Sequence, residues 1–300
     1  AGNDAEASGK SFEQLAEAAR TDWNNELDHF EVEGTPDQKA MFYTSLYHTM
    51  INPCVYTDVD GQYRGLDGNI HKADDFTNYT VFSVWDTYRA LHPLFNIINR
   101  QVNTDIARSM LKHCEQSVHK ALPVWSHMAN ENWCMIGYHS VSVLADAVAK
   151  GLPLDKEEVL QAMVSSSTIP YYDGTKEYME KGYVALDHNG SAGSLTLEYA
   201  YDDWTIYNTA RLAGNDRVAV HLRGCPFRSL RVLPVPWHEC GAVCLGIYQI
   251  RIFISQATAV SERGSVPCLH GRNAGLGRKV PGGWRSPYEK KRTADKEETD

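Results

Sequence analysis

The chain has 300 residues, of which 43% are hydrophobic and 22% are charged. These fractions are typical of a globular domain and exclude a disordered polymer, a collagen or a disulfide-dense miniprotein. No apolar run approaches the roughly 18 residues of a membrane span, so we expect no membrane crossing. The first residues lack the basic and apolar stretches of an export signal, and we expect such a signal to be absent or already removed.

Charge is unevenly distributed along the chain. Residues 1–215 contain 15 Lys and Arg against 30 Asp and Glu, a net charge of −15, whereas residues 216–300 contain 14 against 8, a net charge of +6. A nucleic-acid surface needs clustered cations, so the acidic part argues against a nucleic-acid partner. The seven cysteines include no CxxC pair, and we therefore predict no zinc site.

Helical patterns follow one another up to about residue 214. Capping residues mark several starts, at Ser11, Thr35 and Asp155, and Gly151 and Gly214 suit helix ends. The spacing of apolar residues predicts seven helices, which begin near residues 12, 36, 84, 105, 140, 156 and 194. No strand alternation and no repeat of 30–45 residues is evident, which favours an all-α bundle or α/α toroid over a solenoid.

Three long loops, residues 52–82, 122–139 and 168–193, are rich in aromatic, acidic and amide side chains. Such loops on a helical scaffold often build a binding face. Residues 216–300 differ from everything before them, because glycines and prolines interrupt their apolar stretches. We interpret this basic tail either as a frame-shifted, foreign or disordered segment or as a genuine irregular one.

The first candidate site lies in the segment 57–67. Asp60 and Arg64 flank a glycine turn that could present both side chains to a polyol, although a solvated turn explains the pattern equally well. An EF-hand is excluded, because the loop numbering places Tyr56 at position one and provides no Glu at position twelve.

The second candidate site is the start of the third helix. Asp86 and Arg89 are three residues apart and are expected on one helix face beside Trp85. A carboxylate and a guanidinium can grip vicinal hydroxyls while an aromatic ring stacks on a sugar. An internal ion pair with a core tryptophan is the more ordinary interpretation.

Two further candidates stand at helices near residues 140 and 194. His139 precedes a helix start, where free backbone N–H groups and a titratable ring coincide, although a lone histidine is more often structural. Glu198 and Asp202 are four residues apart, so both carboxylates face one way. Paired carboxylates serve glycosidases and hard-cation sites, whereas a solvated acidic face is the plain alternative.

Motifs of several enzyme classes do not occur in the sequence. The chain contains no GxSxG, P-loop, dinucleotide fingerprint or HExxH, so lipase, NTPase, Rossmann oxidoreductase and zincin functions lose their main support. Aromatic and carboxylate side chains on a helical scaffold instead favour a carbohydrate ligand.

At these same clusters the sequence resembles glycoside hydrolase family 92, the calcium-dependent exo-α-mannosidases. The stretches that carry the resemblance keep the family's order and spacing over about residues 10–215: FYTSLYHTMINP (42–53), DVDGQYRGLD (58–67), FSVWDTYRALHPL (82–94), CMIGYHSVSVLADAVAKG (134–151) and LEYAYDDWTIYNTARLAGN (197–215). The resemblance implies a partial (α/α)6 barrel, its first half, over residues 10–215, with 216–300 unmatched.

The resemblance implies inverting hydrolysis of terminal α-linked mannose, with α-1,2 linkages favoured, a Ca²⁺ ion and export to the periplasm, cell surface or medium. It implies a substrate-binding role for these eight residues: Asp60, Arg64, Trp85, Asp86, Arg89, His139, Glu198 and Asp202. The family's general acid lies in a Thr-Glu-Gly-Asn segment and its base in an Asn-Asp-Asp segment.

Neither of these two segments occurs here. We therefore assign no catalytic residue, expect the calcium ligands outside the matched region, and expect an inactive fragment of a mannosidase. The alternative is a non-catalytic helical module that binds a glycan or a protein.

Overall fold

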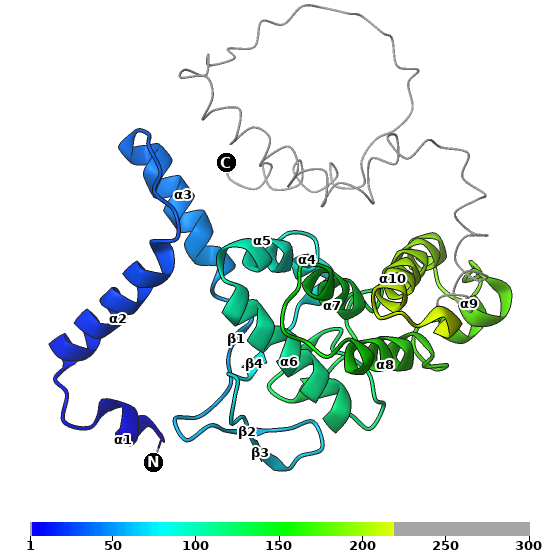
Figure 1. Ribbon diagram of the computed structural model, residues 1–300, viewed down its shortest axis with the longest axis horizontal. Coiled ribbons are helices and arrows are strands. Elements are labelled where there is room, and N and C mark those ends of the chain that lie inside the picture. The colour runs from blue at the N-terminus through cyan, green and yellow to red at the C-terminus, as the bar shows by residue number, and fades with distance from the viewer. Residues whose placement is uncertain (1, 219–300) are drawn as a thin grey trace, which may run out of the picture. The chain divides into compact units, whose positions relative to one another are not determined.

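The computed structural model of the chain describes residues 2–218, so the basic tail from residue 219 onward lies outside the described residues. Helices dominate this part of the chain, as the sequence predicted (Figure 1). The helices are α1 (Gly2–Ala7), α2 (Phe12–Leu27), α3 (Pro36–Thr49), α4 (Val84–Thr87), α5 (Leu91–Ile98), α6 (Arg100–Gln116), α7 (Ser140–Ala149), α8 (Lys156–Ser167), α9 (Thr175–Lys181) and α10 (Ala192–Leu212).

The predicted caps of α2 and α3 are confirmed. Ser11 and Gln14 exchange side-chain and backbone hydrogen bonds in a capping box, and Thr35 and Gln38 do the same. The predicted cap of α8 is also present, because Asp155 accepts hydrogen bonds from the backbone N–H groups of the first turn at 2.9 Å. Each of these helix starts is thus decided by residues within one turn of it.

The third predicted helix is broken in two. We expected one apolar stripe from Val84 to Ile98, but the structure ends α4 at Thr87 and begins α5 at Leu91. Pro93 explains the break, because its nitrogen carries no hydrogen and its ring would clash with the carbonyl four residues earlier in a continuous helix. Arg89 therefore lies just beyond α4 instead of on a helix face with Asp86.

The fourth predicted helix begins earlier than expected. We placed its start at Thr104 and Asp105, whereas α6 begins at Arg100. Asn99 is the actual N-cap, and its side chain accepts a hydrogen bond from Val102 N. The polar first turn of α6 hid this start from the apolar pattern.

Three small antiparallel strand pairs, two of them hairpins, occupy two of the long loops, and the sequence pattern did not reveal them. The strands pair as β1 with β4, β2 with β3, and β5 with β6. Their bounds are β1 (Cys54–Val55), β2 (Gln62–Arg64), β3 (Ile70–Lys72), β4 (Tyr79–Thr80), β5 (Ser126–His127) and β6 (Asn130–Glu131). The hairpins fold the loops back on themselves and leave the described chain predominantly helical.

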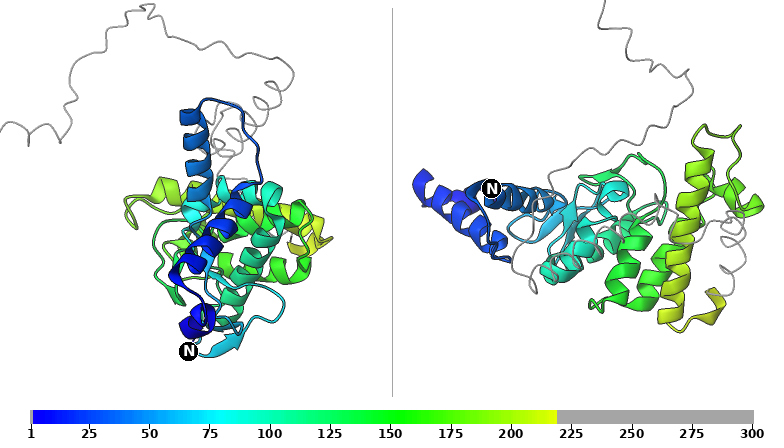
Figure 2. Two further views of the ribbon diagram at one scale, coloured as in Figure 1. Left: turned by 90° about the vertical axis from the view of Figure 1, so that its left-hand side faces the viewer. Right: turned by 90° about the horizontal axis from the view of Figure 1, so that it is seen from above.

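The core lies among α5, α6, α7, α8 and α10. Helix α7 packs against each of the other four, and the ribbon views show these helices side by side (Figures 1 and 2). Their contact faces bury large apolar side chains completely, among them Ile106, Met110, Leu144, Met163 and Leu195. Within residues 2–218 no helix has the length and apolarity to cross a membrane.

Candidate functional site

His139 is the centre of a buried cluster that joins two of the sequence candidates. His139 stands at the N-cap position of α7 without a capping hydrogen bond from its side chain, which is 1% exposed. Nδ1 lies 2.8 Å from Asp202 Oδ1 in a hydrogen-bonded ion pair, and Nε2 lies 3.1 Å from Glu198 Oε2. The second contact is an ion pair whose direction falls short of a hydrogen bond. The predicted orientation of Glu198 and Asp202 toward one side of α10 is confirmed.

Aromatic rings and an arginine cover this cluster. The Tyr88 ring stacks on the His139 imidazole with centroids 4.2 Å apart. The Arg89 guanidinium carbon lies 4.6 Å from the Trp85 ring centroid and 4.8 Å from that of Tyr88. Arg89 Nη2 lies 3.8 Å from Glu198 Oε1. Arg89 is half-buried, so the cluster reaches solvent at this arginine.

The two carboxylates set the charge of His139. Burial alone would lower the pKa of the imidazole, but Asp202 and Glu198 outweigh this effect and raise the pKa to about 9. Burial acts to raise the pKa of Glu198, yet the charges of His139 and Arg89 bring that pKa below its ordinary value. Burial raises the pKa of Asp202, while the charge of His139 and the Tyr138 N–H act to lower it. The arrangement therefore favours an imidazolium between two carboxylates.

Asp203, the neighbour of Asp202 in the chain, belongs to a different buried group. Its carboxyl accepts hydrogen bonds from Tyr138 Oη at 2.8 Å and Tyr178 Oη at 3.3 Å. Burial raises the pKa of Asp203 to about 7, because these two bonds do not offset the loss of water. Tyr138 also donates its backbone N–H to Asp202 Oδ2 at 2.8 Å and thus connects both acids.

Asp60 and Arg64 lie outside this cluster. Asp60 accepts hydrogen bonds from the backbone and side chain of Gln62, at 3.0 and 2.6 Å, so it closes an exposed turn. Arg64 is exposed on β2 and lines a small pocket with Tyr63 and His113. Among the described residues, no hydrogen bond, ion pair or ring contact joins either side chain to His139. The structure therefore favours the solvated-turn interpretation for Asp60.

Asp86 is exposed at the edge of α4 and does not pair with Arg89. Its Oδ2 accepts a hydrogen bond from Ser83 Oγ at 2.5 Å. The internal Asp86–Arg89 pair considered from the spacing is wrong, because the helix ends at Thr87 and Arg89 reaches Glu198 instead. Trp85 is half-buried, and its indole N–H acts to lower the pKa of Glu198, although it makes no well-directed hydrogen bond to a described residue.

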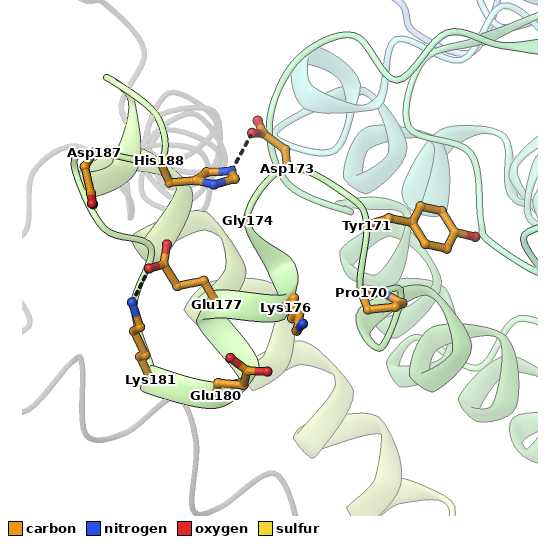
Figure 3. Close-up of a pocket in the computed structure, with 10 residues that line it drawn as sticks. All are labelled: Pro170, Tyr171, Asp173, Gly174, Lys176, Glu177, Glu180, Lys181, Asp187 and His188. Atoms are coloured by element: carbon orange, nitrogen blue, oxygen red, sulfur yellow. Dashed lines mark hydrogen bonds and ion pairs between the residues drawn. The ribbon is translucent and has the colours of Figure 1, made fainter.

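A larger cavity of about 580 Å³ lies around α9 and the segment that precedes it (Figure 3). None of the predicted site residues lines it. Four of its side chains form two ion pairs: His188 lies 3.8 Å from Asp173, and Lys181 contacts Glu177. The cavity is therefore a surface hollow in which part of the charge is already paired.

The described residues do not fit a metal ion. Across residues 2–218, no group of three or more His, Cys, Asp and Glu side chains is arranged to hold one. The pair considered as a hard-cation site, Glu198 and Asp202, directs its oxygens at His139. A calcium ion would meet the imidazolium there, so we derive no chemistry through a metal at this cluster.

Several residues of the site escaped the sequence prediction. Tyr88 stacks on His139, and Tyr138 donates its backbone N–H to Asp202. Both tyrosines lie in the stretches quoted above, but only the fold reveals these contacts. Gly137 adopts a φ of +80°, and a Cβ there would collide with the His139 ring. The Gly-Tyr-His sequence could have indicated a tight turn in front of α7, although not that this turn packs against the His139 ring.

A helical scaffold with buried carboxylates and exposed aromatics is an arrangement that suits a carbohydrate-processing protein, and sequence comparison identifies its class. The chain belongs to glycosyl hydrolase family 92, whose catalytic domain matches residues 2–224. This match confirms the family resemblance. A comparison with curated proteins finds no match.

Solved structures of this family share the fold. The chain is similar to the family GH92 α-mannosidase BT3965 from Bacteroides thetaiotaomicron, solved with mannoimidazole, at 46% identity and a TM-score of 0.71 over 74% of this chain and 29% of that one. It is also similar to the inverting mannosidase BT2199 from the same organism, at 32% identity and a TM-score of 0.68 over 74% and 31% of the two chains. The chain thus spans less than a third of the length of these relatives.

Proposed function

We propose that the chain is a portion of an inverting exo-α-mannosidase, and that the His139 cluster is part of its mannose-binding site. Two observations support the reaction class: the family match and the similarity to solved α-mannosidases, one of them described as inverting. The terminal α-linked mannose of a glycan is the proposed substrate, with α-1,2 linkages favoured.

The observation that carries the proposal is the half-buried Arg89 held between Trp85 and Glu198. A guanidinium edge and a carboxylate oxygen at the mouth of a buried network can donate to and accept from adjacent sugar hydroxyls. The neighbouring indole supplies an apolar face for the C–H side of the ring, and its N–H favours the ionised form of Glu198. Asp86, exposed beside them, would accept a further hydroxyl.

Asp60 and Arg64 stand as weaker members of the proposed site, because they belong to a separate hairpin. His139 and Asp202 are buried and would act on the sugar through Glu198. The Ca²⁺ ion that the family resemblance implies is proposed to bind outside the matched region, residues 10–215.

We propose that the 300-residue chain does not hydrolyse mannosides. Inversion needs an acid and a base on opposite sides of the scissile bond, separated widely enough to admit a water molecule. The family's Thr-Glu-Gly-Asn and Asn-Asp-Asp segments, which carry these groups, do not occur in the sequence. Location in the periplasm, at the cell surface or outside the cell remains part of this proposal.

Ligand titration by NMR tests the binding site. We expect methyl α-mannoside to bind the full chain weakly and saturably, and we expect Arg89→Ala to abolish this binding. Arg20→Ala, an exposed arginine on α2, is the matched control and should bind like the parent chain. Equal binding by Arg89→Ala would contradict the assignment.

An activity assay tests the predicted lack of turnover. The chain is incubated with α-1,2-linked mannobiose, with calcium and with a chelator, and free mannose is measured. We expect no release. Calcium-dependent release that disappears in Asp86→Ala would overturn the proposed inactivity and support hydrolysis by the chain itself.

A non-catalytic glycan- or protein-binding module is the second candidate, and the missing acid and base segments favour it. Calorimetry distinguishes it from a damaged enzyme: millimolar or tighter mannoside binding without turnover supports a binding module. Absence of any mannoside binding leaves a protein ligand as the alternative.

A further inference from the structure

Four charged side chains form a line of alternating sign from the core to the surface. Asp202 contacts His139 at 2.8 Å, His139 contacts Glu198 at 3.1 Å, and Glu198 contacts Arg89 at 3.8 Å. The exposed fraction of the side chains rises in the same order: 0% for Asp202, 1% for His139, 17% for Glu198 and 33% for Arg89. The solvent-facing arginine is thus connected to a fully buried acid.

The inner end of this line is fixed by the backbone. Tyr138 N–H donates to Asp202 Oδ2 at 2.8 Å, and the positive φ of Gly137 brings the chain directly against the imidazole. Tyr88 stacks on one face of the ring. These contacts surround the His139 ring, whose two nitrogens point at Asp202 and Glu198.

The arrangement requires a charged His139. A neutral imidazole has one N–H, and its other nitrogen would present a lone pair to one of the two carboxylates. A buried pair that loses one charge leaves the partner charge uncompensated, which is strongly unfavourable. The groups that face the ring are Asp202, Glu198 and Tyr201 from α10, and Tyr88 at the end of α4, with Arg89 behind Glu198.

We propose that Asp202 and His139 are positioning residues that hold Glu198 and Arg89 ready for a ligand hydroxyl. They do not touch the ligand themselves. His139 occupies Glu198 Oε2 and leaves Oε1 beside Arg89, so that a carboxylate oxygen and a guanidinium edge are presented together at the surface. This role in ligand binding rests on the mannose-binding function proposed above, whereas the charge of His139 can be tested without any ligand.

Titration of the histidine ring by NMR in the full 300-residue chain is the first measurement. The His139 signal is assigned by its loss in His139→Gln. We expect the imidazole to stay protonated through neutral pH, with a pKa near 9 instead of the ordinary value of about 6.5. A ring that titrates near the ordinary value overturns the proposal.

Substitutions at two adjacent buried acids, Asp202 and Asp203, distinguish a positioning role from a general effect on packing. Asp202→Asn should lower the pKa of His139 by about 1–3 units, because it removes the nearest opposite charge. Asp203→Asn alters an equally buried neighbour that contacts Tyr138 and Tyr178, and it should leave the His139 titration unchanged. If Asp202→Asn does not fold, Glu198→Gln serves instead, since it removes the second carboxylate at a partly exposed position. An unchanged pKa in the Glu198→Gln chain would overturn the proposal.

Binding of methyl α-mannoside tests the consequence for the ligand. We expect Asp202→Asn to weaken binding about tenfold or more and Asp203→Asn to leave it unchanged. Equal binding by Asp202→Asn and the parent chain overturns the positioning role. If the parent chain binds no mannoside, the proposed function fails. The imidazole titration alone then decides whether His139 is held in its charged form between Asp202 and Glu198.

Discussion

The ring of Tyr88 lies against the imidazole of His139, with centroids 4.2 Å apart and an angle of 23° between the planes. Tyr88 ends α4 and His139 begins α7, so this single contact connects two helices whose residues are about fifty positions apart. The charged imidazolium faces the negative surface of an aromatic ring, an attraction that adds to burial. The contact therefore stabilises both the fold and the charge of the histidine.

Replacement of the Tyr88 ring tests this contact. Tyr88→Leu should lower the free energy of unfolding by about 0.5–2 kcal/mol beyond its packing loss and lower the pKa of His139, because the aromatic face is gone. Tyr88→Phe keeps the face and should preserve the His139 pKa. Urea unfolding and NMR titration provide the measurements, and identical His139 titrations in both variants would contradict the idea.

Gly137→Ala should damage the site more than an equally strained glycine substitution elsewhere. Gly137 and Gly68 have nearly the same φ, +80° and +79°, but a Cβ at Gly137 would lie 2.6 Å from His139 Cε1, whereas a Cβ at Gly68 would meet open space. We expect Gly68→Ala to cost about 1 kcal/mol from backbone strain alone. Gly137→Ala should cost about 1–3 kcal/mol more, since the His139 ring must move.

Chemical denaturation of the two glycine variants measures these costs, and mannoside titration of the same samples measures the effect on binding. Only Gly137→Ala should weaken binding. Equal destabilisation by both substitutions would show that the approach of residue 137 to the His139 ring is not as close as described.

Glu131 organises the loop before α7, and its substitution should destabilise the chain. Its two oxygens accept the backbone N–H groups of Val124, Trp125 and Trp133, each at 2.9 Å. Glu131→Gln replaces one accepting oxygen by a donor, so at least one buried N–H loses its partner. We expect a loss of about 2–3 kcal/mol in the free energy of unfolding. The exposed Glu33→Gln is the control, and a similar stability of both variants would argue against the predicted role.

Asp203 should make stability decrease as the pH rises. Its folded-state pKa of about 7 exceeds the unfolded value near 3.9, so the folded chain binds the proton more tightly. The corresponding stabilisation is present below about pH 4 and is lost as the pH approaches 7. Urea unfolding between about pH 4.5 and 6.5 should therefore show a steeper decline for the parent chain than for Asp203→Asn. The exposed Asp187→Asn should retain the parental slope.

The N-terminal helices should promote self-association. Helix α2 buries none of its residues, and Phe12 and Met41 are 79% and 64% exposed. Large exposed apolar side chains favour aggregation. We expect light scattering to increase with concentration, and Phe12→Ser with Met41→Ser to reduce it. A monomeric chain with a sharp cooperative melt would contradict this expectation.

Several features decided within one helical turn could be predicted from the sequence, although the N-cap of α6 at Asn99 was missed. The caps at Ser11, Thr35 and Asp155 depend on a side chain and an N–H two or three residues away, and all three are present. The six short strands could not be predicted, because two or three residues carry no measurable alternation. Helix α9 is bounded by Gly174 and Gly182, both at positive φ, and its seven residues are too few for a convincing apolar pattern.

The candidate site was predicted as separate parts. His139, Glu198 and Asp202 were each recognisable by residue type and helix position. Their mutual contact was not, since about sixty residues separate the histidine from its carboxylates. The same limit explains the Asp86–Arg89 error: a local spacing rule indicated a pair, whereas a distant glutamate competes successfully for the arginine.

The line from Asp202 to Arg89 also constrains how the chain can fold during synthesis. Arg89 leaves the ribosome more than a hundred residues before Glu198, and translation at about 5–20 residues per second separates the two by several seconds or more. During that interval α4 and α7 lack the carboxylates that accept their charges. The surface arginine and the histidine can reach their final places only after α10 has emerged, so the ligand-facing part of the site is among the last features of residues 2–218 to form.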